Sequence, residues 1–279
     1  MDDQIEVKII ADSISSTENG TRITTLQLKY HRYIHAEFMT HRVFSRSASS
    51  SRAIPIMKTI RQVWTDPAMP VHWGKNISGM QAKSELTNIR LYLAKFLWRL
   101  SAKTACVAAL GFHYIGLHKQ IGNRMLEPWQ FINVIVTSTE FDNFFKLRIH
   151  PDAQPEIHVL AKKMKQCIDR STPEKLGKDS GNGTWHLPYI SHSEKLRFPI
   201  SILLKVSVAR CARVSYNNHD GSIPDIGKDI ALHDMLVGSE PLHASPAEHQ
   251  AFPIENNLQL FYKNFRGWEQ YRTIIEENI

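Results

Sequence analysis

The stretch THRVFSRSASSSR, residues 40–52, contains five serines and three arginines and follows a segment with strand-like alternation. Guanidinium groups bind phosphates through paired hydrogen bonds, and serine hydroxyls add neutral donors. The stretch therefore predicts an oxyanion-binding segment at the end of a strand. A Ser/Arg loop without any ligand is an equally typical interpretation of this composition.

The sequence on either side predicts a mixed α and β fold. Apolar residues alternate at 5–9 and 26–30, and we expect further strands at 34–39, 131–137 and 257–263. Ser84 can begin a helix toward Gly111, in which one apolar stripe consists of Leu86, Ile89, Leu93, Phe96, Leu97 and Leu100. Further helices are expected at 140–149, 154–169, 199–213, 225–237 and the C-terminus. We predict one domain over residues 1–279, with residues 171–195 as an exposed excursion.

Composition limits the class of protein. The 279 residues include 34 Lys and Arg against 27 Asp and Glu, a formal net charge of +7 that favours phosphate-bearing ligands. No dense basic block marks a nucleic-acid arm, and no long apolar run or basic leader indicates a membrane span or secretion, so the cytoplasm is expected. Three scattered cysteines form no disulfide framework. No HExxH, Cys/His cluster, GxGxxG or P-loop is present, so we predict no metal site and no Rossmann fold.

The 40–52 stretch resembles the Arg-His-Arg signature of the flavin-dependent thymidylate synthases. Five positions match in register: His41, Arg42, Ser45, Ser50 and Arg52. Thr40 and Ser47 stand where the signature has Arg and Asn.

Further segments resemble the same family. Residues 143–148 (NFFKLR) and 153–157 (AQPEI) are similar to its NFxxLR and AQxEI stretch, and Arg124 resembles its upstream nucleotide-binding Arg. Residues 212–216 (ARVSY) and 243–249 (HASPAEH) also resemble family segments. In the commonest members those two segments precede the signature, whereas here they follow it, so we expect a circular permutation of the motif order. The repeated LQLKY and LQLFY, at 26–30 and 258–262, would then mark strands near the old join.

The resemblance implies a thymidylate synthase-complementing type of α+β fold, with a mixed, largely antiparallel sheet flanked by long helices. It implies reductive methylation of dUMP to dTMP, with 5,10-methylenetetrahydrofolate as carbon donor, FAD as the flavin and NADPH as reductant. It also implies a homotetramer with active sites between subunits. Arg148 is the expected catalytic residue. The expected dUMP contacts are Glu37, Ser49, Ser50, Ser51, Arg52, Arg124 and Arg148. The expected FAD contacts are His41, Arg42, Thr137, Thr139, Asn143, Ser215, Ser245 and Glu248, with His243 near the folate.

Two alternatives belong to other classes. A basic nucleic-acid-binding protein would account for the net charge and would bind DNA or RNA with a steep salt dependence. A degenerate homologue that binds nucleotide without turnover would account for Thr40 and Ser47.

Overall fold

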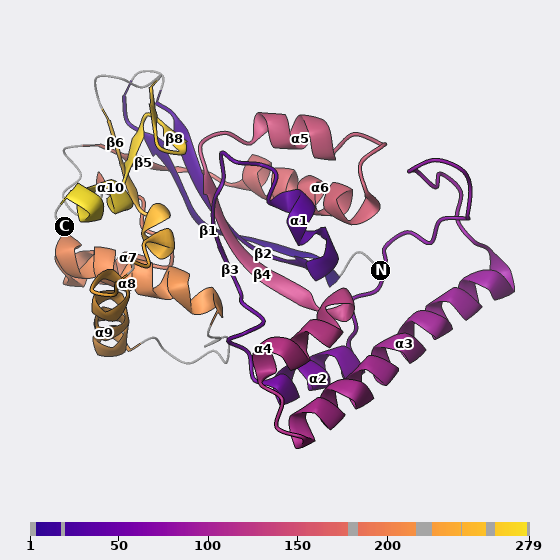
Figure 1. Cartoon of the computed structure of the whole chain (residues 1–279). Helices are drawn as coiled ribbons and strands as arrows, with labels where there is room; N and C mark the ends of the chain where they lie inside the picture. Colours follow the sequence, from indigo (N-terminus) through magenta and orange to yellow (C-terminus); the bar gives the residue numbers. More distant parts are fainter. Residues whose placement is uncertain are drawn as a thin grey trace.

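A five-stranded sheet runs through the middle of the chain (Figure 1). This computed structural model describes residues 4–17, 20–177, 184–215, 225–240, 242–254 and 260–277. The strand order is β3-β4-β2-β1-β5. The strands are β1 (Glu6–Ser15), β2 (Arg22–His31), β3 (Ser45–Ala48), β4 (Phe131–Ser138) and β5 (Glu174–Leu176).

Three of the four strand pairings in this sheet are antiparallel, and only β5 runs parallel to its neighbour β1. In the register, Leu26 of β2 lies between Ile9 of β1 and Val136 of β4, with a bulge between Ile9 and Ala11. The predicted mixed, largely antiparallel sheet flanked by long helices is confirmed, as are the strands expected at 5–9, 26–30 and 131–137.

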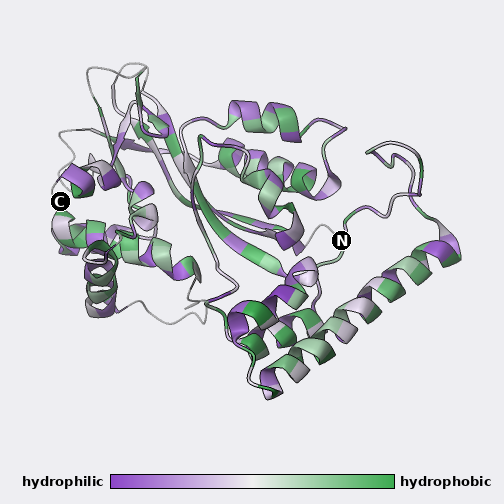
Figure 2. Cartoon of the chain, in the orientation of Figure 1, coloured by the Kyte–Doolittle hydropathy of each residue, from purple (hydrophilic) through white to green (hydrophobic). Residues whose placement is uncertain are grey.

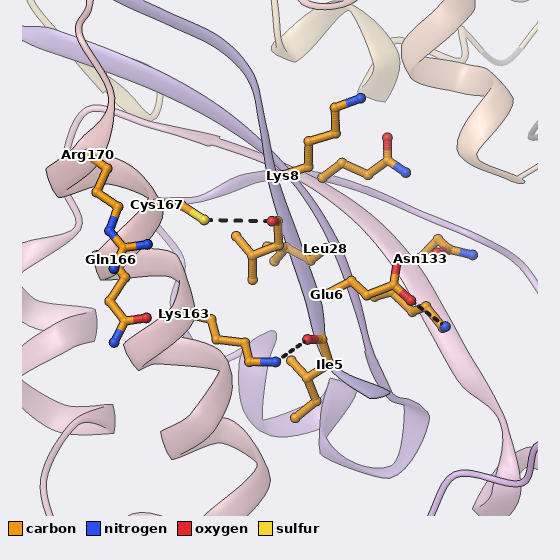
Figure 3. A pocket seen from close by; sticks show the side chains of 12 residues that line it. Ile5, Glu6, Lys8, Leu28, Asn133, Lys163, Gln166, Cys167 and Arg170 are labelled. Atoms are coloured by element: carbon orange, nitrogen blue, oxygen red, sulfur yellow. Dashed lines mark hydrogen bonds and ion pairs between the residues drawn. The ribbon is translucent and has the colours of Figure 1, made fainter. Parts of the chain in front are cut away.

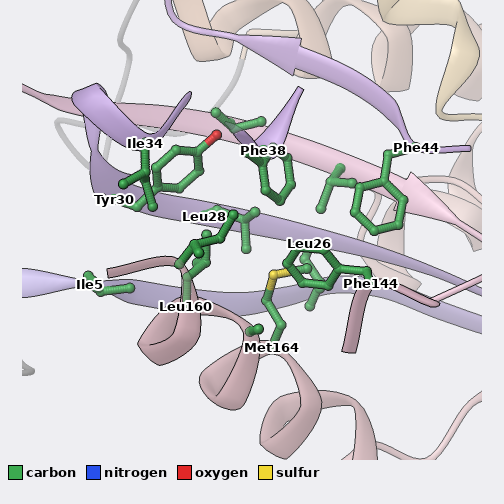
Figure 4. Close-up of a cluster of buried hydrophobic side chains, with 14 of the residues drawn as sticks. Ile5, Leu26, Leu28, Tyr30, Ile34, Phe38, Phe44, Phe144, Leu160 and Met164 are labelled. Atoms are coloured by element: carbon green, nitrogen blue, oxygen red, sulfur yellow. The ribbon is translucent and has the colours of Figure 1, made fainter. Parts of the chain in front are cut away.

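One face of the sheet packs against α1 (His35–Phe38), α5 (Asp142–Arg148) and α6 (Pro155–Arg170). Helix α6 begins with Pro155, whose fixed backbone suits a first helical position, and its buried residues recur at Ile157, Leu160, Ala161 and Met164. Figure 4 shows this core, in which Leu160 and Met164 meet Leu26, Leu28 and Phe144. The apolar residues of β2 therefore anchor α5 and α6, which carry part of the candidate site.

The opposite face is covered by the C-terminal third of the chain. Its helices are α7 (His192–Arg197), α8 (Ile200–Ala212), α9 (Ile226–Val237) and α10 (Tyr271–Glu277), with the 3-10 helices η5 (Arg213–Ser215) and η6 (Ser245–Glu248). Two small sheets join β6 (Ala251–Pro253) to β9 (Trp268–Gln270) and β7 (Phe261–Tyr262) to β8 (Phe265–Arg266). Buried Asp229 of α9 accepts hydrogen bonds from Arg210 and Arg213, and thereby fixes α9 to α8.

A separate helical group lies beyond one end of the sheet. It consists of α2 (Ile56–Thr65), α3 (Asn88–Tyr114), α4 (Lys119–Gly122) and the 3-10 helix η3 (Asn123–Trp129), and α3 forms its outer edge (Figure 1). Small residues of α3, among them Ala102, Cys106 and Ala109, pack on α2 and η3. An apolar stripe usually faces a core, but Ile89, Leu93, Phe96, Leu97 and Leu100 are exposed here.

Three sequence predictions differ from the structure. The strand expected at 34–39 is instead the 3-10 helix η2 (Arg32–Ile34) followed by α1, because a helical turn brings Ile34 and Phe38 to the same side of the backbone, where both are buried. The helix expected from Ser84 begins at Asn88, after an extended Thr87.

The third difference concerns residues 171–195, which we expected to be exposed. Residues 174–176 form β5, and both His186 and Leu187 are buried, so the described part of this segment covers the sheet. The strand expected at 257–263 is present at Phe261–Tyr262, whereas 255–259 lie outside the described residues.

Candidate functional site

Arg148, at the end of α5, makes a three-way contact with the segment between η2 and β3. Its Nε donates to Nε2 of His41 at 2.9 Å, one terminal nitrogen donates to the Glu37 carboxylate, and the other donates to the Thr40 hydroxyl at 3.4 Å. The structure thus brings together three of the predicted site residues, Glu37, His41 and Arg148, of which the last two come from separate motif segments. A carboxylate fixes the guanidinium plane, and each terminal nitrogen keeps an N–H for a ligand.

His41 is held in its neutral form at this contact. Burial, together with the cations Arg148 and Arg46, lowers its pKa to about 4. Neutral imidazole can accept at Nε2, which agrees with the hydrogen bond from Arg148. Arg46 also donates to the carbonyls of Met39 and His41, so the first part of the 40–52 stretch is fixed by its own arginine.

Two of the serines after β3 are buried and hydrogen-bonded within the protein, and one keeps exposed surface that a ligand could contact. Ser49 is buried and its hydroxyl accepts from the backbone N–H of Asn133, which continues the pairing of β3 with β4. Ser51 is also buried and donates to Glu127. Ser50 accepts from the backbone N–H of Arg52 and is half-buried. Of the three predicted dUMP-binding serines, Ser50 is therefore the one with exposed surface.

Glu127 of η3 organises a second polar group beside this turn. It accepts from Arg124 at 3.2 Å and from Ser51 at 3.1 Å, and it pairs with Arg32 at 3.2 Å. The guanidinium of Arg124 remains more than half exposed. Arg124 therefore lies next to the serine turn, where a ligand phosphate could take the place of part of this network.

Arg42 and Arg52 lie at the two ends of the serine-rich stretch and are both exposed. Neither makes an ion pair with a residue that the structure describes. Their exposed guanidinium groups, together with Ser50, offer the donor chemistry that a phosphorylated ligand needs. The residues present therefore fit an oxyanion-bearing nucleotide or flavin.

The remaining predicted ligand residues occupy different environments. Asn143, Ser245 and His243 are exposed, whereas the Thr139 hydroxyl accepts from the backbone of Arg266 and Glu248 is paired with Arg272. Ser215 ends η5, and its side chain lies outside the described part of the chain. Thr137 has no exposed surface. A direct ligand contact by Thr137 would require the fold around it to open.

The buried Thr137 belongs to a hydrogen-bonded chain that crosses the second face of the sheet. Consecutive links measure 2.9, 2.8, 2.7, 2.8 and 2.9 Å. In order, the members are Ser13, His186, Thr25, Thr137, His249 and Ser47. Burial lowers the pKa of His186 and of His249 to about 3, so both rings are neutral at ordinary pH.

Neutrality couples the proton positions of this chain. Each neutral imidazole has one donor and one acceptor nitrogen, and each threonine hydroxyl has one proton, so all links must run in the same direction. Ser13 is buried at one end, and among the described residues its hydroxyl bonds to His186, so its proton is satisfied by donating to that ring. His249 then donates to Ser47, which leaves the Ser47 proton for an outside acceptor. The chain thus makes Ser47, within the 40–52 stretch, a hydrogen-bond donor.

A groove of about 600 Å³ lies elsewhere, beside β1 and α6 (Figure 3). None of the predicted ligand residues lines it. Along its wall, Lys163 donates to the Ile5 carbonyl at 2.7 Å and the Cys167 thiol to the Val7 carbonyl at 3.6 Å. Residues of β1, β2, β4 and α6 line this groove, and it is separate from the motif residues.

The part of the chain that the structure describes has neither a metal-binding cluster nor a membrane-spanning helix. No three His, Cys, Asp or Glu side chains gather there as a group that could hold a metal ion. Within the same ranges, no helix has the length and apolarity needed to cross a lipid bilayer.

Comparison with known proteins finds only low similarity in sequence and structure. No protein-family model matches the chain, and no curated protein does. Solved structures similar to it include the UMP/dUMP methylase PolB from Streptomyces cacaoi bound with 5-Br UMP, at 16% identity and a TM-score of 0.46. The same methylase bound with 5-Br dUMP gives 14% identity and a TM-score of 0.47. Each alignment covers 58% of this chain and 88% of the other. Similarity at this level does not establish a function.

Several residues of the site were not predicted from the sequence. Glu127 and Arg32 sit in ordinary helical and strand-end contexts, and His186 lies in a segment expected to be exposed. His249 was within a matched segment but had no assigned role. An available signal was the set of hydroxyl residues that fall within predicted strands, such as Thr25 and Thr137, which must find hydrogen-bond partners when a strand is buried.

Proposed function

We propose that this protein is a flavin-dependent thymidylate synthase, which converts dUMP to dTMP with 5,10-methylenetetrahydrofolate as the carbon donor. The observation that carries the proposal is the contact of Arg148 with Glu37 and His41, which joins two segments that resemble family motifs across more than 100 positions of sequence. The 243–249 segment reaches the same strand, because His249 bonds to Ser47 of β3. Three motif segments are thus adjacent in space.

Arg148 would act on the uracil ring. Glu37 and His41 hold its guanidinium plane, and the remaining N–H groups of the two terminal nitrogens can donate to the O2 and N3 edge of the base. A fixed cation there stabilises negative charge developing on the ring and makes C5 a better carbon nucleophile. The neutral state of His41 keeps a second positive charge away from this cation.

The nucleotide phosphate would bind at the serine turn. Arg52 and Arg124 supply cations, and Ser50 supplies a hydroxyl and adjacent backbone. Arg124 would exchange part of its contact with Glu127 for the phosphate. Glu127 also holds Ser51, so phosphate binding would adjust the turn that carries Ser50 and Arg52.

FAD, when bound and reduced by NADPH, would supply the reducing hydride. The exposed Arg42 and Asn143, together with the donor hydroxyl of Ser47, would hold it, and the exposed His243 would contact the folate. Ser47 stands where the family signature has Asn, and an outward hydroxyl proton would retain one donor at that position.

No cysteine is positioned as a nucleophile in this proposal. Cys211 is fully buried, and burial raises its pKa, which opposes formation of the thiolate. Burial also raises the pKa values of Cys106 and Cys167. Replacing all three cysteines by Ala or Ser should leave dTMP formation largely intact.

The decisive measurement is the visible absorbance spectrum of the purified protein with excess FAD, before and after addition of dUMP. Retained flavin after gel filtration and a dUMP-dependent spectral change support the proposal. Protein that retains no flavin contradicts it. Flavin retention without dTMP formation would favour the degenerate homologue, and salt-sensitive binding of DNA by a colourless protein would favour the nucleic-acid alternative.

Arg148→Lys separates ring stabilisation from phosphate binding, with Arg52→Lys as the matched control. Lysine lacks the planar fork, so we expect Arg148→Lys to keep FAD and to lose about two to three decades of kcat. Arg52→Lys should mainly raise the apparent KM for dUMP. Equal, mild defects confined to the KM in both variants would remove the catalytic role of Arg148.

A further inference from the structure

The groove beside β1 and α6 carries an excess of positive charge. Its volume of about 600 Å³ is within the range of small-molecule sites. The basic residues that line it are Lys8, Lys29, Lys163 and Arg170, and among the described residues Glu6 is the only acidic one in the lining. Four basic residues and one acidic residue give the lining a formal net charge of +3.

Helix α6 forms one wall of the groove (Figure 3). Lys163, Gln166, Cys167 and Arg170 recur at helical spacing, so they lie on one stripe of this helix. The apolar residues of α6 face the sheet, which is why hydrophilic and hydrophobic residues are mixed along the helix (Figure 2). The polar stripe of α6 therefore faces the groove, and it ends at the exposed Arg170.

Side chains of three neighbouring strands form the other wall. Glu6 and Lys8 of β1 are two residues apart and therefore point to the same face of the sheet. The register places Lys29 opposite Glu6, Gln27 opposite Lys8, and Asn133 of β4 opposite Lys29. Directly opposite residues share a face, so these five side chains lie together. Both walls of the groove thus carry cations.

The backbone of β1 between the two walls is already in use. Lys163 donates to the Ile5 carbonyl at 2.7 Å, and the Cys167 thiol donates to the Val7 carbonyl at 3.6 Å. A peptide that adds to a sheet as a strand needs such carbonyls as acceptors. The groove therefore favours a ligand that side chains recognise, and its ammonium, guanidinium and amide donors suit oxyanions.

We propose that this groove binds a small ligand that carries a polyphosphate chain, such as a nucleoside triphosphate or inorganic tripolyphosphate. Lys8 on the sheet wall and Arg170 on the helix wall are both exposed, so successive phosphates of one chain can pair with both walls. A single phosphate would neutralise only part of the charge of +3. The proposal is independent of the function proposed above, because none of the residues predicted to bind dUMP or FAD lines the groove.

Cys167 provides a reporter in the groove. Burial raises the pKa of its thiol, and the cations Arg170 and Lys163 oppose this shift. A bound polyphosphate would cover the thiol and screen these cations, so reaction of Cys167 with iodoacetamide should become slower. Cys106 and Cys211 are buried and should react slowly with or without a ligand.

The test is the rate of alkylation of Cys167 in the full chain, measured by peptide mass spectrometry at increasing concentrations of tripolyphosphate or ATP. We expect saturable protection that weakens at higher salt. Equal protection by the two compounds would identify the phosphate chain as the recognised group. Stronger protection by ATP would add a contact with the nucleoside to the same site.

Two variants remove one exposed cation from each wall. Lys8→Ala and Arg170→Ala should each raise the concentration needed for half-maximal protection by about tenfold. Lys162→Ala is the matched control, because it removes the same charge from an exposed position of α6 outside the groove. Lys162→Ala and Arg52→Ala, the latter at the serine turn, should leave the half-maximal concentration unchanged.

Circular dichroism of each variant establishes that the chain is folded. The proposal is overturned if neither polyphosphate slows alkylation of Cys167, or if Lys162→Ala weakens protection as much as the two groove variants do. Protection that depends on Arg52, and not on Lys8 or Arg170, would place the ligand at the serine turn and would also overturn it. Single-stranded DNA that protects Cys167 at far lower concentration than either polyphosphate would assign the groove to nucleic acid instead.

Discussion

The second face of the sheet buries hydroxyl and imidazole groups from Ser13 to His249, whereas the outer side of α3 exposes leucines, an isoleucine and a phenylalanine. The two regions depart from ordinary burial in opposite directions. In the hydrogen-bonded chain from Ser13 to Ser47, each member has a partner, so the cost of removing these groups from water is offset by hydrogen bonds. In α3, the exposed groups have no partner within the described chain. The polar groups of this hydrogen-bonded chain therefore find their partners within one chain, and the apolar groups on the outer side of α3 do not.

Acidification should destabilise the buried hydrogen-bonded chain, and this is the largest effect that we expect. The folded pKa values of His186 and His249 are about 3, below the ordinary 6.5, so the unfolded chain takes up protons that the folded protein excludes. Their contribution to stability is complete above about pH 6.5 and decreases as the pH falls toward 3. By about pH 5 the free energy of unfolding should fall by roughly 4 kcal/mol for the pair.

Urea unfolding at a series of pH values measures this loss. A variant with His186→Gln and His249→Gln should show a shallower dependence of stability on pH, whereas His113→Gln, at the exposed end of α3, should retain the wild-type slope. An unchanged slope in the double variant would assign the acid sensitivity to other groups, such as His35 and His41, whose pKa values are lowered to about 4.

A single truncation in the chain should have the next largest effect. His186→Ala leaves the hydroxyls of Ser13 and Thr25 without their shared partner and opens a cavity, so we expect a loss of about 3 kcal/mol in the free energy of unfolding. His113→Ala should cost less than about 0.5 kcal/mol. Similar losses in both variants, measured by urea unfolding, would contradict the difference between the two regions.

Removing one hydroxyl from the middle of the chain should cost less and should also test its direction. Thr25→Val leaves His186 and Thr137 without that link, with an expected loss of about 2 kcal/mol. In the wild-type protein, nitrogen NMR should find the proton on Nε2 of both His186 and His249. A proton on Nδ1 of either ring would reverse the direction that we derive and would withdraw the donor role of Ser47.

The smallest expected effect is a gain in stability on α3. Gly111→Ala has space for its methyl group and improves helix propensity, so it should raise the stability of the protomer by about 1 kcal/mol in urea unfolding. Gly122→Ala is a suitable contrast, because its Cβ would lie 2.6 Å from the Ile56 side chain. A loss of protomer stability in Gly111→Ala would mean that the glycine has a role inside the chain.

Much of the fold could be predicted from periodicity. Alternation identified β1 and β2, a β-rich run identified β4, and helical patterns placed α5, α6, α8 and α9 close to their observed bounds. The prediction failed at residues 34–39, because residues four positions apart share a face in a strand and also in a helical turn. Ile34 and Phe38 are such a pair, and only the tertiary packing selects the turn. The stripe of α3 was recognised, but an apolar pattern does not state which molecule will cover it.

The candidate site could be predicted only in its motif residues. The resemblance assigned Glu37 and Arg148 to dUMP and His41 to FAD, and the structure shows that the side chains of Glu37 and His41 both contact Arg148. It could not place His186, because the partners that make this histidine buried and neutral, Ser13 and Thr25, come from strands far away in the sequence. Contacts of this kind depend on strand register, which local sequence does not specify.

The free edge of β1 has a consequence for aggregation. Strand β5 pairs only with Ser13–Ser15, so the earlier part of β1 has no strand on its outer side among the described residues. Exposed strand edges recruit strands from other molecules. Here Lys163 and Cys167 of α6 donate to the carbonyls of Ile5 and Val7, which removes acceptors that an incoming strand would need. Helix α6 therefore protects this edge from pairing with other molecules at high protein concentration, as during overexpression. Replacing Lys163 should reduce solubility more than activity.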